Sequence, residues 1–166
     1  MRDDVMARYD DERLPRYTIY PTSSHFTTEV GADDYAAWLP DVPAGATASL
    51  YLHVPFCRAL CTSYGRPAGI TRQDGSMADY VALLRREVNL IAGRLREAPQ
   101  VRHVHFGGAL TVMAPDTFVD LVATMRARFP FDPAAEIALE IDPLNLAPDM
   151  IGALRWAGAT RAILDV

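Results

Sequence analysis

The chain has 166 residues, half of them hydrophobic, which is enough to bury the core of about one domain. Its net charge of −5 and pI near 5.3 argue against a nucleic-acid-binding surface, which needs a basic stripe. No run of ~18 apolar residues is present, so no membrane span is predicted. The N-terminus, MRDDVMARYDDERLPRY, is too charged for a secretory signal, and we expect a cytoplasmic location.

Residues 1–46 show little periodicity and are expected to form an N-terminal arm and linker. A short helix is predicted over Asp33–Leu39 within this arm. Pro40, Pro43 and Gly45 follow and are typical of a linker between structured parts.

From residue 47 onward, hydrophobic periods of two alternate with periods of three to four, which predicts strands alternating with helices. The predicted strands are 48–54, 101–106, 134–141 and 159–166. The predicted helices are 79–97, 115–129 and 148–156, with a polar loop over 71–78. This order indicates an α/β fold with a parallel sheet and right-handed crossovers.

The first strand leads into the only two cysteines of the chain. Pro55 lacks an N–H and is expected to end the strand, which places Cys57 and Cys61 in a loop at its carboxyl end. Thiolates there can bind a soft metal or an iron–sulfur cluster. Two alternatives stay open: a short-loop disulfide between the cysteines, and zinc or copper held by His53, Cys57 and Cys61.

The stretch LYLHVPFCRALC resembles the opening of the radical S-adenosylmethionine enzymes, and more narrowly the oxygen-independent coproporphyrinogen III oxidases. That family carries Cys-x3-Cys-x2-Cys after such a strand, and the three thiolates hold a [4Fe–4S] cluster that binds S-adenosylmethionine. Cys57 and Cys61 match the first two metal ligands. Tyr64 stands at the third position and Arg66 where a further cysteine is common. A phenol is a hard oxygen donor with a pKa near ~10, so Tyr64 is not a credible cluster ligand.

Three further phrases carry the same resemblance: RYTIYPT at residues 16–22, HFGGALT at 105–111 and ALEIDP at 138–143. The resemblance implies that the first lies across the mouth of the active site. The cofactor-binding residues that it implies are Tyr51, Ser63, Gly107, Gly108 and Glu140. The family reads GGGTPT where this chain has GGALT, and an ordinary tight turn also explains the two glycines. His103 and His105 share a strand face and are interpreted as packed or solvent-facing histidines.

The fold implied by the resemblance is the front part of a partial (β/α)6 barrel, with residues 47–166 supplying about three and a half of its βα units. A fourth strand at the chain end would be a raw sheet edge, so we expect a longer enzyme with a C-terminal half beyond this chain. The implied reaction is the oxidative decarboxylation of porphyrinogen propionates to vinyl groups, with S-adenosylmethionine as cofactor. The alternative hypothesis is a non-catalytic remnant or a haem- or metal-binding relative, with His103, His105 or Cys57 as candidate haem ligands.

Overall fold

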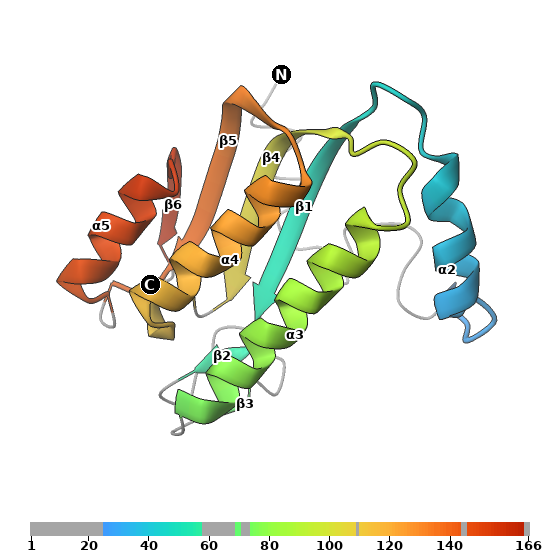
Figure 1. Cartoon of the computed structure of the whole chain (residues 1–166). Helices are drawn as coiled ribbons and strands as arrows, with labels where there is room; N and C mark the ends of the chain where they lie inside the picture. The colour runs from blue at the N-terminus through green and yellow to red at the C-terminus, as the bar shows by residue number, and fades with distance from the viewer. Residues whose placement is uncertain (1–24, 58–68, 71–73, 109, 144–145, 165–166) are drawn as a thin grey trace, which may run out of the picture. The chain divides into compact units, whose positions relative to one another are not determined.

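The computed structural model describes residues 25–57, 69–70, 74–108, 110–143 and 146–164 (Figure 1). The chain divides into two compact units, residues 1–35 and 36–166. A short helix, α2 (Ala32–Trp38), confirms the one predicted near Asp33, and the 3-10 turn η2 (Leu39–Asp41) follows it. The Asp34 carboxylate accepts the N–H of Gly31 at 2.8 Å, which satisfies a donor at the start of the helix.

A four-stranded sheet organises the second unit. Its strands are β1 (Thr47–Val54), β4 (Gln100–Gly108), β5 (Phe131–Ile141) and β6 (Arg161–Leu164). They lie in the order β1-β4-β5-β6, and every neighbouring pair is parallel. The spatial order follows the chain order, so right-handed crossovers place all the connecting helices on one face. The predicted α/β fold with a parallel sheet is confirmed.

The helices that cover this face are α3 (Asp74–Ala92), α4 (Pro115–Arg128) and α5 (Pro148–Trp156), seen side by side in Figure 1. The core lies between them and the sheet. Its buried strand residues alternate along each strand: Leu52, Val54, Val104, Phe106, Ile137, Leu139 and Ile141. The helices contribute Val81, Phe118, Leu121, Val122, Met125, Met150, Ala153 and Leu154. The opposite sheet face therefore carries the polar half of each alternating pattern.

The boundaries of α3 differ from the prediction. The helix begins at Asp74, inside the segment interpreted as a polar loop, and ends at Ala92 instead of residue 97. Gly93 follows directly, and its N–H donates to the carbonyl of Asn89 at 3.0 Å. Glycine gains the most backbone freedom by leaving a helix, so the chain turns here although the apolar spacing continues to Leu95.

The region after β1 also differs from the prediction. Pro55 separates β1 from a second short strand, β2 (Phe56–Cys57), which pairs in parallel with β3 (Gly69–Ile70). Cys57 thus ends a strand instead of lying in an open loop. The predicted ligand Cys61, and also Ser63, Tyr64, Arg66 and the RYTIYPT phrase, lie outside the described residues. No helix in the described ranges combines the length and the apolarity needed to cross a membrane.

Candidate functional site

The carboxyl ends of β1, β4 and β5 meet at one edge of the sheet, where parallel α/β proteins place their ligand sites. Gly107 and Gly108 end β4, two residues beyond the predicted end of that strand. The phenol ring of Tyr51 from β1 lies directly on Gly107, since a Cβ built on this residue would collide with the Tyr51 hydroxyl. A side chain at position 107 and the Tyr51 ring therefore cannot occupy their places together.

Gly108 adopts a positive φ of 80°, which residues with a side chain rarely do. A Cβ here would collide with the backbone carbonyl oxygen of Val54, so position 108 excludes side chains for two separate reasons. The N–H of Gly108 donates to Oε2 of Glu140 at 2.6 Å. This short charge-assisted hydrogen bond ties the end of β4 to the end of β5.

His105 reaches the same carboxylate from the strand that carries the glycines. Its Nε2 lies 3.2 Å from Oε1 of Glu140, and the side chains of the pair are 36% and 19% exposed. Its ring also packs edge-on against Tyr51, with 5.3 Å between the ring centroids. The interpretation of His105 as an ordinary surface or core histidine missed this contact, because the sequence does not show which residue of β5 faces it.

A second set of contacts fixes the junction between β1 and β2. The hydroxyl of Tyr80, from α3, donates to the backbone carbonyl of His53 at 2.7 Å, and its ring packs edge-on against Phe56. Burial, with a smaller contribution from the negative charge of Glu87, raises the pKa of Tyr80 above its usual 10.0. The hydroxyl of Tyr51 lies 3.0 Å from Nδ1 of His53, a contact between two side chains on the same face of β1.

Four of the predicted cofactor residues therefore converge: Tyr51, Gly107, Gly108 and Glu140. Their roles in binding stay predictions. The donor set for the cluster does not fit a [4Fe–4S] group, because the chain offers Cys57, Cys61 and the Tyr64 phenol where three thiolates are needed. Within the described ranges, no group of three or more His, Cys, Asp or Glu side chains could hold a metal ion.

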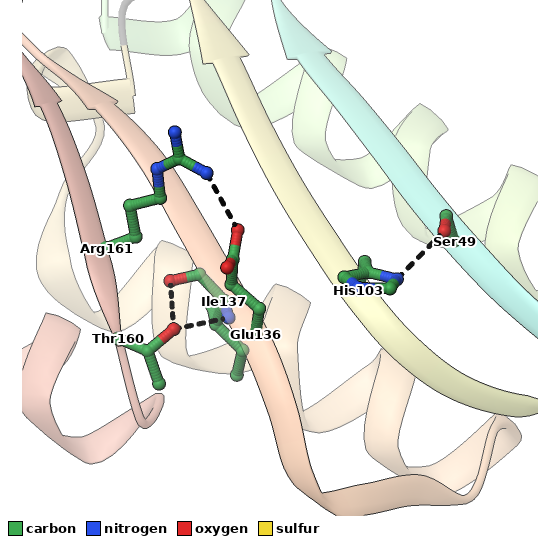
Figure 2. Close-up of polar contacts among 6 residues, drawn as sticks. All are labelled: Ser49, His103, Glu136, Ile137, Thr160 and Arg161. Carbon is green, nitrogen blue, oxygen red and sulfur yellow. Dashed lines mark hydrogen bonds and ion pairs between the residues drawn. The ribbon is translucent and has the colours of Figure 1, made fainter.

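A second polar layer lies on the same sheet face, nearer the amino ends of the strands (Figure 2). His103 Nδ1 lies 3.3 Å from the Ser49 hydroxyl, and Arg161 donates to Glu136 at 3.2 Å. The Arg161 and Glu136 side chains are 62% and 46% exposed. Like the site at the carboxyl edge, this layer contains a histidine of β4 and a glutamate of β5, but its charged side chains are more exposed to solvent.

Comparisons with known proteins agree with the fold. A solved structure of coproporphyrinogen III oxidase from Escherichia coli, described as a radical SAM enzyme, matches with a TM-score of 0.80 and 31% identity. The match covers 91% of this chain and 35% of that one. The sheet and its one-sided helices are thus part of a radical SAM barrel. No protein-family model matches the chain.

Curated relatives narrow the class of radical SAM enzymes that the chain resembles. The oxygen-independent coproporphyrinogen III oxidase of Bradyrhizobium diazoefficiens is 50% identical over the whole chain, and that of Cereibacter sphaeroides is 36% identical over 94% of it. The chain belongs to the family of the oxygen-independent coproporphyrinogen III oxidases. It spans 37% and 35% of the length of these two relatives.

Proposed function

We propose that the chain is the adenosyl-binding part of an oxygen-independent coproporphyrinogen III oxidase-like radical SAM oxidoreductase. The observation that carries this proposal is the convergence of Tyr51, Gly107, Gly108 and Glu140 at the carboxyl edge of the sheet. Glu140 supplies acceptors for hydroxyl groups, Tyr51 supplies an aromatic face, and the glycines let a ligand approach the backbone. S-adenosylmethionine presents a ribose, a purine and an amino-acid end that suit these three features.

The proposal assigns a role to each part of this chain and to the parts that such an oxidoreductase needs beyond it. Residues 1–46 serve as an arm and linker, and residues 47–166 form the first part of the barrel. The remaining barrel units would complete the cavity for a porphyrinogen, the small-molecule substrate that the family name implies. The proposal includes a cytoplasmic location.

The chain as it stands lacks a complete set of cluster ligands. The resemblance implies that three thiolates bind three of the four irons of a [4Fe–4S] cluster. This chain has only two of them, so a second iron is left without a protein ligand. Arg66 adds positive charge but has no lone pair that could bind iron. The proposed role of Tyr51, Gly107, Gly108 and Glu140 is to bind and orient the adenosyl ligand.

Restoring the third thiolate tests the proposal. We expect the purified wild-type chain to retain little iron and sulfide after anaerobic reconstitution, and Tyr64→Cys to retain about four irons per chain with a [4Fe–4S] absorption and EPR signature. Thr62→Cys is the matched control, since it adds a thiol at the wrong spacing and should behave like the wild type.

Two results would count against the proposal. One is equal cluster content in Tyr64→Cys and Thr62→Cys. The other is a sharp Soret band when haem is added to the wild-type chain together with no cluster in either variant, which would favour the haem-binding remnant.

A further inference from the structure

His105 occupies the position between the two side chains that the proposed site depends on. Its Nε2 contacts Glu140 on one side, and its ring packs against Tyr51 on the other. Tyr51 comes from β1 and Glu140 from β5, so His105 in β4 joins residues from both neighbouring strands.

The register of the sheet explains how this bridge forms. His105 pairs with Ala138 of β5, so Gly107 and Glu140 each lie two residues further along their strands. Ala138 is too small to fill the space in front of His105, and the ring can lean toward Glu140. Gly107 has no side chain, which leaves room for the Tyr51 ring beside His105.

The contacts with Glu140 place a hydrogen on Nε2 of the His105 ring and hold the position of the carboxylate. An ionised carboxylate only accepts, so Nε2 of His105 carries the hydrogen in this pair. Glu140 then accepts from His105 at Oε1 and from the Gly108 backbone at Oε2. Both oxygens are tied to β4, so the carboxylate cannot rotate without breaking a contact. The edge-on packing of Tyr51 limits rotation of the His105 ring in turn.

We propose that His105 is a positioning residue that sets the distance between the Tyr51 ring and the Glu140 carboxylate, and so shapes the site for an adenosine-containing ligand. The inference rests on the proposed function, because it concerns the same site. It assigns no contact between His105 and the ligand. His105 acts through Glu140, Tyr51 and the Gly107–Gly108 turn, which it holds in the binding arrangement before a ligand arrives.

The chain offers a close control in His103, which lies two residues earlier on the same strand face. His103 contacts Ser49, as Figure 2 shows, instead of Tyr51 or Glu140. Replacing either histidine by leucine removes a comparable polar side chain from β4. Only the change at position 105 removes the bridge.

The direct test is the rate of amide hydrogen exchange at Gly108, which NMR measures on the whole chain. We expect His105→Leu to speed exchange of the Gly108 amide about tenfold, since Glu140 loses its second anchor. His105→Gln should restore slow exchange, because its side-chain N–H reaches about as far as Nε2 of histidine. His103→Leu should leave the Gly108 amide unchanged. Equal Gly108 exchange in His105→Leu and His103→Leu would overturn the proposal.

A binding measurement separates this inference from the proposed function. The probe is S-adenosylhomocysteine in equilibrium dialysis. We expect His105→Leu to weaken its affinity about tenfold, with His105→Gln and His103→Leu within about twofold of the wild type. Unchanged affinity in His105→Leu would refute the positioning role. Absence of binding by the wild type would refute the adenosyl-binding function, while the Gly108 exchange rates would still decide whether His105 holds the turn.

Because a leucine variant can lose stability for other reasons, thermal unfolding accompanies each measurement. His105→Gln keeps a polar side chain of similar length and remains decisive if His105→Leu does not fold. In that case the proposal predicts a wild-type rate of Gly108 exchange in His105→Gln and a faster rate in Glu140→Gln. Wild-type rates in both variants would contradict it.

Discussion

Two acidic side chains of β5 point to the same sheet face and have different partners. Glu136 pairs with Arg161 of β6, and both side chains are about half exposed. Glu140 pairs with His105 of β4 and also accepts the N–H of Gly108, with only 19% of its side chain exposed. The contacts are 3.2 Å in both pairs. The difference therefore lies in solvent access and in the added backbone donor, and it indicates that Glu140 constrains the fold locally while Glu136 contributes little.

The largest expected effect concerns the backbone that Glu140 holds. Gly108→Ala should lower the free energy of unfolding by about 2–4 kcal/mol, because the residue has a positive φ and its Cβ would collide with the Val54 carbonyl. Urea or thermal unfolding measures this change. Gly152→Ala is the control: its Cβ meets nothing within 4 Å in the exposed part of α5, and it should stabilise the chain by up to ~1 kcal/mol. Similar changes in both variants would contradict the described turn.

A smaller effect is expected from the two acidic residues themselves. Glu140→Gln should cost about 1–2 kcal/mol, since the half-buried acceptor of two donors loses its charge. Glu136→Gln should change stability by less than about 0.5 kcal/mol, because its partner is solvated. Chemical unfolding of both variants in one buffer checks the ranking. A cost at position 136 equal to that at position 140 would show that solvent access does not separate the two pairs.

The smallest effect depends on pH and concerns the neighbouring strand end. The folded chain raises the pKa of Tyr80, so the neutral phenol is favoured in the folded state. The stability that the neutral Tyr80 phenol contributes is fully present below pH ~10, and it is lost as the pH rises through the raised pKa of the folded state. Tyr80→Phe should cost about 1 kcal/mol at neutral pH through the lost bond to the His53 carbonyl.

The same variant should lose less stability than the wild type above pH ~10, because phenylalanine cannot ionise. Unfolding curves at neutral and alkaline pH measure the difference. Tyr35→Phe, at a half-exposed tyrosine, serves as the control. If the cost of Tyr80→Phe were the same at both pH values, the phenol would not be coupled to folding.

The sequence predicts the fold well because its strands and helices have clear periods. The alternation of Leu50, Leu52 and Val54 places the core face of β1, and α5 has the predicted bounds, Pro148–Trp156. The convergence of the site follows from two facts together: each of the four residues lies in the carboxyl half of its strand, and the sheet is parallel. Neither fact depends on the detailed register.

The contacts of His105 depend on that register and could not be predicted. A register shift between Val101 and His103 places His105 opposite Ala138, and so within reach of Glu140. A shift by one residue would turn the ring to the other face. The β2–β3 pairing was missed for a similar reason, since two-residue strands leave no period to detect.

That short pairing has a consequence for how the chain can change over time. Phe56 pairs with Gly69 and Cys57 with Ile70, while Phe56 packs on the core and contacts Tyr80, so both ends of the intervening segment are joined at a fixed base. The contacts that join Phe56 and Cys57 to Gly69, Ile70 and Tyr80 all come from residues outside 58–68. We therefore expect the sheet and its helices to keep their packing when a predicted ligand position in that range is substituted, and a single codon change at position 64 would supply a cysteine there.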